Sequence, residues 1–291
     1  MDRIPAEILK KVKLLELSTR RLVNNIFAGE YKTAFKGQGM TFADFREYVP
    51  GDDVRAISWT LTAKAGKPYI KKFEEERELS MFLLVDVSSS LDFGSQYAAK
   101  GETLTHLAAL LAFSAVRNKD QVGMLMFTDR VEHFVPLGKG RGHVQRILRD
   151  LYYVKPKGQG TSIDVAAQYL QGLLKKKAVV FILSDFLDQN FDVGLRSLSK
   201  KHDVTALVLE DPLEQNFPAM GLVDIEDPET GEVLTVDSSS HSFQEAYRRA
   251  RAVRVSERDK FLRKSQVDRI EIVNAENFID PVIKYFKRKK R

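Results

Sequence analysis

The chain has 291 residues, of which 43% are apolar and none is cysteine, and its formal net charge is +6. This composition indicates a globular protein with a substantial core, and it excludes disulfides, thiolate catalysis and cysteine-ligated zinc. No run of about 18 apolar residues occurs, and residues 1–11 lack the apolar stretch of a signal peptide. We therefore expect a soluble, cytoplasmic protein without a membrane span.

The N-terminal part of the chain predicts two segments. Over Pro5–Ala28 apolar side chains recur at helical spacing between lysines and arginines, and Gly29 ends the pattern, which predicts an amphipathic helix. Residues 31–78 are rich in turns. They predict a tight turn at Pro50-Gly51 and a strand over Lys67–Phe73.

From residue 79 on, apolar runs that predict strands alternate with amphipathic stretches that predict helices. Strands are expected at Leu79–Val85, Val122–Phe127, Ala178–Leu183 and Val204–Leu209, with a hairpin partner at Val131–Pro136 and an edge strand at Val267–Val273. Helices are expected at Gly101–Val116, His143–Tyr152, Ile163–Leu174, Val193–Lys200 and Phe243–Arg263. This alternation predicts an α/β fold with a doubly wound, mostly parallel sheet.

These segments predict three parts of the chain. Residues 1–78 are expected to form a helix and a turn-rich extension that pack on the main domain, with Trp59 as the core anchor of the extension. Residues 79–275 are expected to form the α/β domain, and residues 276–291 a C-terminal helix and a basic tail. The basic run Lys284–Arg291 predicts a solvated, frayed end.

Oxygen-bearing side chains gather at the ends of the predicted strands. The strand that begins at Leu79 runs into the sequence Asp-Val-Ser-Ser-Ser, the strand that begins at Ala178 runs into Ser-Asp, and a threonine precedes the helix that begins at Ile163. In doubly wound sheets ligands bind at the carboxyl ends of the strands. The residues expected to converge there are Asp86, Ser88, Ser90, Thr161 and Asp185.

This set of side chains suits a small, hard cation. Mg²⁺ prefers oxygen ligands, keeps several waters and needs only one or two carboxylates. The hydroxyls of Ser88 and Ser90 can lie in one hemisphere, Asp86 and Asp185 can add charge and orient water, and Thr161 can add a hydroxyl from across the cleft. We therefore expect a site for Mg²⁺ or Mn²⁺, and with few protein charges around it the ion would accept a carboxylate from a partner.

Local capping is the alternative for the same residues. Aspartate and serine often cap helices and satisfy loop amides, and Asp86, Ser88 and Ser90 could do only that. The sequence Thr161-Ser-Ile-Asp164 fits a capping box, with Thr161 as the cap and Asp164 returning to its amide. A threonine can cap a helix in one state and bind a metal in another, so both roles stay open for Thr161.

The pattern Asp86-x-Ser88-x-Ser90, together with Thr161 and Asp185, resembles the metal-ion-dependent adhesion site of von Willebrand A domains. Upstream, the stretch GQGMTFADFREYVPGDDVRAISW resembles the signature of the bacterial family known as "domain of unknown function 58", in which it stands directly before an A-type domain. The resemblance covers about residues 30–210. One departure is Phe186, because many A domains have glycine after the last acidic residue.

The resemblance implies a non-enzymatic protein that binds other proteins through its metal. It further implies a MoxR-type AAA+ ATPase as partner, in the assembly or maturation of other proteins. Two other classes remain as alternatives. A magnesium-dependent phosphoryl hydrolase with Asp86 as nucleophile is disfavoured, because position 88 is serine rather than an acid and no histidine, cysteine or lysine lies at a spacing that predicts a general acid beside Asp86. A nucleic-acid-binding protein would use the basic tail, but no nucleic-acid-binding motif accompanies it.

Overall fold

The computed structural model describes residues 5–23, 31, 34, 41–74, 78–92, 99–158, 160–188, 191–226, 231–273 and 277–289. By its internal contacts the chain divides into two units, one of residues 1–34 and 80–291 and one of residues 35–79. The larger unit contains the α/β domain together with the N-terminal helix, and the smaller unit contains the turn-rich extension. The packing of the extension on the α/β domain stays a prediction.

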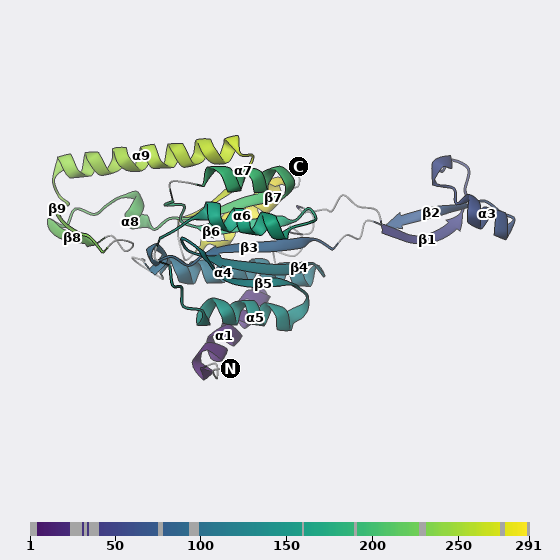
Figure 1. The fold of residues 1–291 in the computed structure, drawn as a ribbon, viewed down its shortest axis with the longest axis horizontal. Coiled ribbons are helices and arrows are strands. Elements are labelled where there is room, and N and C mark those ends of the chain that lie inside the picture. The colour runs from purple at the N-terminus through teal and green to yellow at the C-terminus, as the bar shows by residue number, and fades with distance from the viewer. Residues whose placement is uncertain are drawn as a thin grey trace. The chain divides into compact units, whose positions relative to one another are not determined.

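Within the described residues, six strands of the larger unit form one sheet in the order β10-β7-β6-β3-β4-β5 (Figure 1). These strands are β3 (Ser80–Asp86), β4 (Gln121–Phe127), β5 (Val131–Gly138), β6 (Val179–Ser184), β7 (Asp203–Leu209) and β10 (Asp268–Ile272). Neighbouring strands are parallel except for β4 and β5, which are antiparallel. The predicted doubly wound, mostly parallel α/β fold is confirmed.

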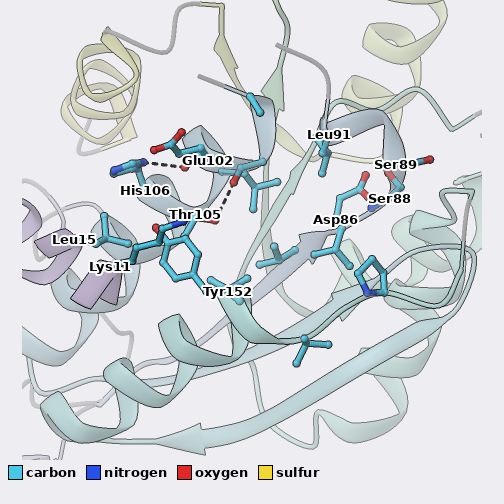
Figure 2. Close-up of a pocket in the computed structure, with 18 of the residues that line it drawn as sticks. Lys11, Leu15, Asp86, Ser88, Ser89, Leu91, Glu102, Thr105, His106 and Tyr152 are labelled. Atoms are coloured by element: carbon cyan, nitrogen blue, oxygen red, sulfur yellow. Dashed lines mark hydrogen bonds between the residues drawn. The ribbon is translucent and has the colours of Figure 1, made fainter. Parts of the chain in front are cut away.

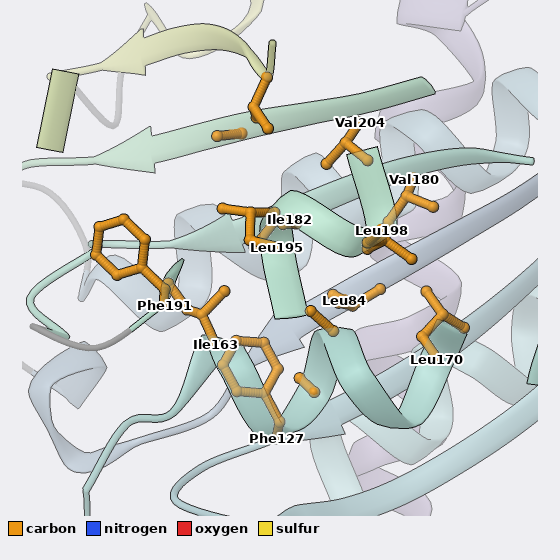
Figure 3. Packing of buried hydrophobic residues seen from close by; sticks show 14 of the residues in the cluster. Leu84, Phe127, Ile163, Leu170, Val180, Ile182, Phe191, Leu195, Leu198 and Val204 are labelled. Atoms are coloured by element: carbon orange, nitrogen blue, oxygen red, sulfur yellow. The ribbon is translucent and has the colours of Figure 1, made fainter. Parts of the chain in front are cut away.

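Helices cover both faces of this sheet, as the apolar character of the strands requires. The helices of the larger unit are α1 (Ala6–Leu22), α4 (Lys100–Arg117), α5 (Gly140–Tyr153), α6 (Ile163–Leu173), α7 (Asp192–Lys201), α8 (Pro212–Gln215), α9 (His241–Lys264) and α10 (Ile279–Lys289). On one face Leu84 and Ile182 pack in a buried cluster with Leu170 of α6 and Leu195 of α7 (Figure 3). This packing fixes the carboxyl ends of β3 and β6 side by side.

The opposite face of the sheet carries α10, and the prediction of a solvated, frayed basic end was wrong. Tyr285 and Phe286 are buried, and Phe286 meets the ring of Phe181 of β6 edge-on at 6.2 Å. At the end of the helix the ammonium of Lys289 donates to Asp203 (2.5 Å) and Asp268 (3.2 Å). The basic run is therefore a docked helix as far as Lys289 rather than a frayed tail, because its two aromatic residues supply an apolar face.

Helix α1 packs against α4 and α5 with Val12 and Leu15 buried. Its buried Glu16 pairs with Arg141 and accepts a hydrogen bond from Gln145 at 2.8 Å, so polar contacts add to the apolar ones. The expected end of this helix at positions 28 and 29 lies outside the described residues. Sequence analysis missed a separate antiparallel pair, β8 (Leu222–Glu226) and β9 (Val233–Asp237), which precedes α9.

The smaller unit is an antiparallel pair of strands, β1 (Thr41–Glu47) and β2 (Tyr69–Glu74), joined through a 3-10 turn at Val54–Ala56 and the short helix α3 (Trp59–Ala65). The signature residues 37–40 lie outside the described part of the chain.

Two expectations for the smaller unit have different outcomes. The predicted turn is confirmed, since Gly51 has a φ of 109° and the Asp52 carboxylate accepts two hydrogen bonds from Arg46, at 2.9 and 2.7 Å. The prediction of a core anchor was wrong, since Trp59 is 68% exposed. It is the first residue of a two-turn helix in which no residue is buried.

Candidate functional site

Asp86 and the serines that follow it form a compact group at the carboxyl end of β3. Asp86 is the last residue of the strand, and a 3-10 turn over Ser89–Asp92 follows it closely. The Ser88 amide donates to Asp86 Oδ1 at 3.0 Å, and the Ser88 and Ser90 hydroxyl oxygens lie 3.0 Å apart. All three side chains are buried, so the structure brings together the first three predicted ligands.

The end of the neighbouring strand β6 meets this group. The Ser184 hydroxyl donates to Asp86 Oδ2 at 2.6 Å, and the next residue, Asp185, is also buried. Burial, and then the charge of Asp185, raise the pKa of Asp86 to about 7, although hydrogen bonds from Ser184 and Ser88 oppose the shift. The two predicted carboxylates thus lie close enough to repel each other.

Thr161 belongs to the loop that precedes α6, at the same edge of the sheet. Its neighbour Ser162 donates its amide to the carbonyl of Thr128, which follows β4. The N-cap of α6 is Ser162, whose hydroxyl accepts the Val165 amide at 3.4 Å. The prediction of a capping box with Thr161 as the cap was therefore wrong: the cap is the next residue, Ser162, and Thr161 stands half-buried just outside the helix.

A buried lysine is the feature of this edge that sequence analysis missed. Lys100, the first residue of α4, is 5% exposed, and its ammonium donates to Asp185 at 2.7 Å and to Glu214 at 2.9 Å. Burial alone would disfavour its charge, but the two carboxylates raise the pKa of Lys100 above its ordinary value. Sequence analysis expected no lysine as a general acid beside Asp86; Lys100 instead pairs with Asp185, 85 positions away, a contact that no local spacing reveals.

Phe186 takes the backbone conformation for which glycine is best suited. Its φ is 55°, in the left-handed region that costs energy for a residue with a large side chain. The ring is 2% exposed and meets the ring of Phe191 edge-on at 5.8 Å, so its burial offsets this cost. Phe186 therefore forms a left-handed turn after Asp185 and anchors it in the core.

A cavity of about 1110 Å³ opens beside the loop after β3 (Figure 2). Asp86 and Ser88 line one end of it, and Tyr152 of α5, Thr105 of α4 and Leu15 of α1 line the other. The candidate site therefore adjoins a space large enough for side chains of another molecule.

The donor set fits a small divalent cation. Adjacent ligands of an octahedral Mg²⁺, each at about 2.1 Å from the ion, lie about 3 Å from each other. The Ser88 and Ser90 hydroxyl oxygens have that separation, 3.0 Å. The described residues contain no group of three or more histidine, aspartate or glutamate side chains placed to hold a metal, so a site here depends on hydroxyls. Asp86 and Asp185 would supply its charge.

Comparison with known proteins identifies relatives and similar folds. The family model described as "Protein of unknown function DUF58" matches residues 44–257. An uncharacterised protein of Mycobacterium tuberculosis is 30% identical over 225 residues, which are 76% of this chain and 71% of that protein.

Among solved structures, an aerotolerance-related membrane protein from Bacteroides fragilis matches with a TM-score of 0.46 and 15% identity, over 73% of this chain and 98% of that one. The SpRpn10 VWA domain matches with a TM-score of 0.36 and 12% identity, over 71% and 94%. Both matches concern the fold alone.

The prediction of a cytoplasmic protein was wrong as it stood, because the matching Bacteroides fragilis protein is described as a membrane protein. The prediction rested on composition, and composition does not distinguish a cytoplasmic domain from a similar domain carried by a membrane protein. None of the described helices is long and apolar enough to cross a membrane.

The family model covers more than half of the residues, and its match includes β3, the candidate site and most of α9. The chain belongs to the family described as "Protein of unknown function DUF58".

Proposed function

We propose that this protein binds a partner protein through a divalent cation, Mg²⁺ or Mn²⁺, and is not an enzyme. The ligands would be Asp86, Ser88, Ser90, Thr161 and Asp185. The observation that carries the proposal is the 3.0 Å separation of the Ser88 and Ser90 hydroxyl oxygens beside the buried Asp86 carboxylate. That spacing suits two adjacent ligands of one ion.

The chemistry of the ligands favours a partner that supplies a carboxylate. Serine hydroxyls are neutral, so they orient an ion without cancelling its charge, and Lys100 already neutralises part of the charge of Asp185. An aspartate or glutamate of the partner would complete the coordination and offset the remaining charge. The cavity next to Ser88 leaves room for the residues on either side of that carboxylate.

The family relationship supports a MoxR-type AAA+ ATPase as the partner, in protein assembly or maturation. The test measures binding of this protein to the MoxR-type ATPase of the same organism, with excess Mg²⁺ in one arm and EDTA in the other. We expect binding only with Mg²⁺, and a loss of binding in the double variant Ser88→Ala/Ser90→Ala. The exposed pair Ser242→Ala/Ser256→Ala is the matched control and should bind normally. Equal affinity with Mg²⁺ and with EDTA would contradict metal-dependent recognition.

The hydrolase alternative had lacked a lysine at the site, and Lys100 supplies one through its hydrogen bond to Asp185. The alternative still lacks an acid at position 88, where the buried serine instead contacts Ser90. We expect no metal-dependent turnover of a phosphomonoester. Turnover that disappears in Asp86→Asn would establish the hydrolase instead.

A further inference from the structure

Lys100 occupies an unusual position for a lysine. Its ammonium is buried between Asp185, whose side chain is 1% exposed, and Glu214 of α8, at 2.7 and 2.9 Å. The second oxygen of Glu214 accepts the Asp211 amide at 2.8 Å, in the capping box of α8, so the carboxylate is held in place. A fixed positive charge therefore stands at one of the two aspartates of the candidate metal site.

We propose that Lys100 sets the cation affinity of this site, by offsetting the negative charge of Asp185 so that a divalent ion binds more weakly and the protein neutralises less of its charge. This inference rests on the proposed function and goes beyond it, since it assigns a role to a residue outside the ligand set. Lys100 is here a positioning residue, because it acts through Asp185 rather than on the ion.

The reasoning is a balance of charges among fixed groups. The Lys100 ammonium lies between the carboxylates of Asp185 and Glu214, so with it these two groups and Asp86 together carry two negative charges rather than three. Without the ammonium, three uncompensated carboxylates would act on a divalent ion. The site would then hold its ion more tightly and attract a partner's carboxylate less.

Burial makes this effect large. Lys100 and Asp185 are both shielded from water, so the repulsion between the ammonium and a bound ion is weakly screened. Loss of that charge should tighten cation binding by at least about tenfold.

The experiment titrates Mn²⁺ alone into the full chain by calorimetry, for the wild type, Lys100→Met and Lys100→Arg. Methionine keeps much of the length of the apolar stem and removes the charge, whereas arginine keeps the charge. We expect Lys100→Met to bind Mn²⁺ at least about tenfold more tightly and Lys100→Arg to stay within about threefold of the wild type.

Lys289→Met is the matched control. Lys289 also lies between two carboxylates, those of Asp203 and Asp268, but Asp203 is at the amino end of β7, the opposite edge of the sheet from the candidate site. Its removal should leave Mn²⁺ affinity unchanged. An equal gain of affinity in both methionine variants would overturn the inference, because the gain would then not depend on the position of the charge.

Melting curves in EDTA and in Mn²⁺ cover the case in which Lys100→Met is unstable. The buried Asp185 and the half-buried Glu214 lose their counter-charge in this variant, so it should melt earlier than the wild type in EDTA and gain more melting temperature from Mn²⁺. If the variant stays unfolded in saturating Mn²⁺, the inference is wrong and Lys100 is a structural residue.

The results also separate this inference from the proposed function. If the wild type and Lys100→Met bind Mn²⁺ equally, the inference fails and the proposed metal site stands. If only Lys100→Met binds Mn²⁺, the inference stands and the wild type does not act through a metal. If neither binds, both are overturned.

Discussion

The two loops that meet at the carboxyl edge of the sheet hold their aspartates in opposite electrostatic settings. After β3, Asp86 receives hydrogen bonds from neutral groups, the Ser88 amide and the Ser184 hydroxyl, and its pKa is raised to about 7. After β6, Asp185 receives an ammonium, that of Lys100, at 2.7 Å. One aspartate thus lacks a counter-charge and the other already has one. The proposed cation would supply the missing counter-charge on the side of Asp86 and its two serines.

The largest expected effect follows from removing the aspartate that lacks a counter-charge. Asp86→Ala should lower Mn²⁺ affinity by more than about 100-fold, since even groups behind a metal ligand contribute about 10- to 100-fold. Calorimetry measures the change. Asp224→Ala, at an exposed position of β8, is the control and should bind as the wild type does. Wild-type affinity in Asp86→Ala would show that the loop after β3 holds no ion.

The raised pKa of Asp86 predicts a dependence on pH with a definite sign. Its value is about 7 in the fold and 3.8 in the unfolded reference, so protonation of Asp86 stabilises the metal-free fold fully below about pH 4. That contribution is lost as the pH rises through 7, at up to about 1.4 kcal/mol per pH unit. Urea unfolding in EDTA at pH 5, 6 and 7 should show this trend in the wild type relative to Asp86→Asn.

The same carboxyl makes cation binding depend on pH in the opposite direction. A metal competes with the proton on Asp86, so Mn²⁺ affinity should rise up to about tenfold per pH unit until pH 7 and then level off. Affinity that is flat between pH 5 and 7 would contradict a ligand role for this residue.

A smaller effect is expected from Ser184, which joins the two loops. Its hydroxyl donates to Asp86 Oδ2 at 2.6 Å, so Ser184→Ala leaves the carboxylate less well oriented and should cost about tenfold in Mn²⁺ affinity. Ser114→Ala removes another buried hydroxyl, one that donates to the Leu110 carbonyl at 2.6 Å, and should leave the affinity unchanged. Equal effects of the two variants would attribute the loss to general destabilisation.

The smallest effects separate capping from metal binding in the loop before α6. Ser162→Ala removes the observed cap and should lower the free energy of unfolding by about 1 kcal/mol without changing Mn²⁺ affinity. Thr161→Ala should weaken Mn²⁺ binding by a few-fold up to about tenfold. Should only Ser162→Ala alter Mn²⁺ binding, Thr161 would be removed from the ligand set.

The parts of the fold that could be predicted have local signals. The strand around Leu84 is apolar on both faces, and Asp86 with its serines follows at once, so both the strand and its end are visible in one short stretch. The cap of α6 was displaced by one residue, because Thr161 and Ser162 are both good caps and local patterns rarely settle a boundary.

The parts that were missed depend on contacts between distant segments. Lys100 reaches Asp185 across 85 positions and Glu214 across 114, and no local pattern distinguishes it from a surface lysine. The C-terminal helix did carry a signal, the adjacent Tyr285 and Phe286, but the surrounding basic residues dominated the interpretation. Sequence alone thus predicts the loop after β3 well and the charge balance of the site poorly.

The most direct test of the metal site is anomalous diffraction from crystals of the wild-type protein soaked in Mn²⁺. The account predicts one anomalous peak within bonding distance, about 2.2 Å, of the Ser88 and Ser90 hydroxyl oxygens and beside Asp86. The Lys100 ammonium should remain on Asp185. Fully occupied Mn²⁺ at other positions, with none between these two serines, would contradict the account.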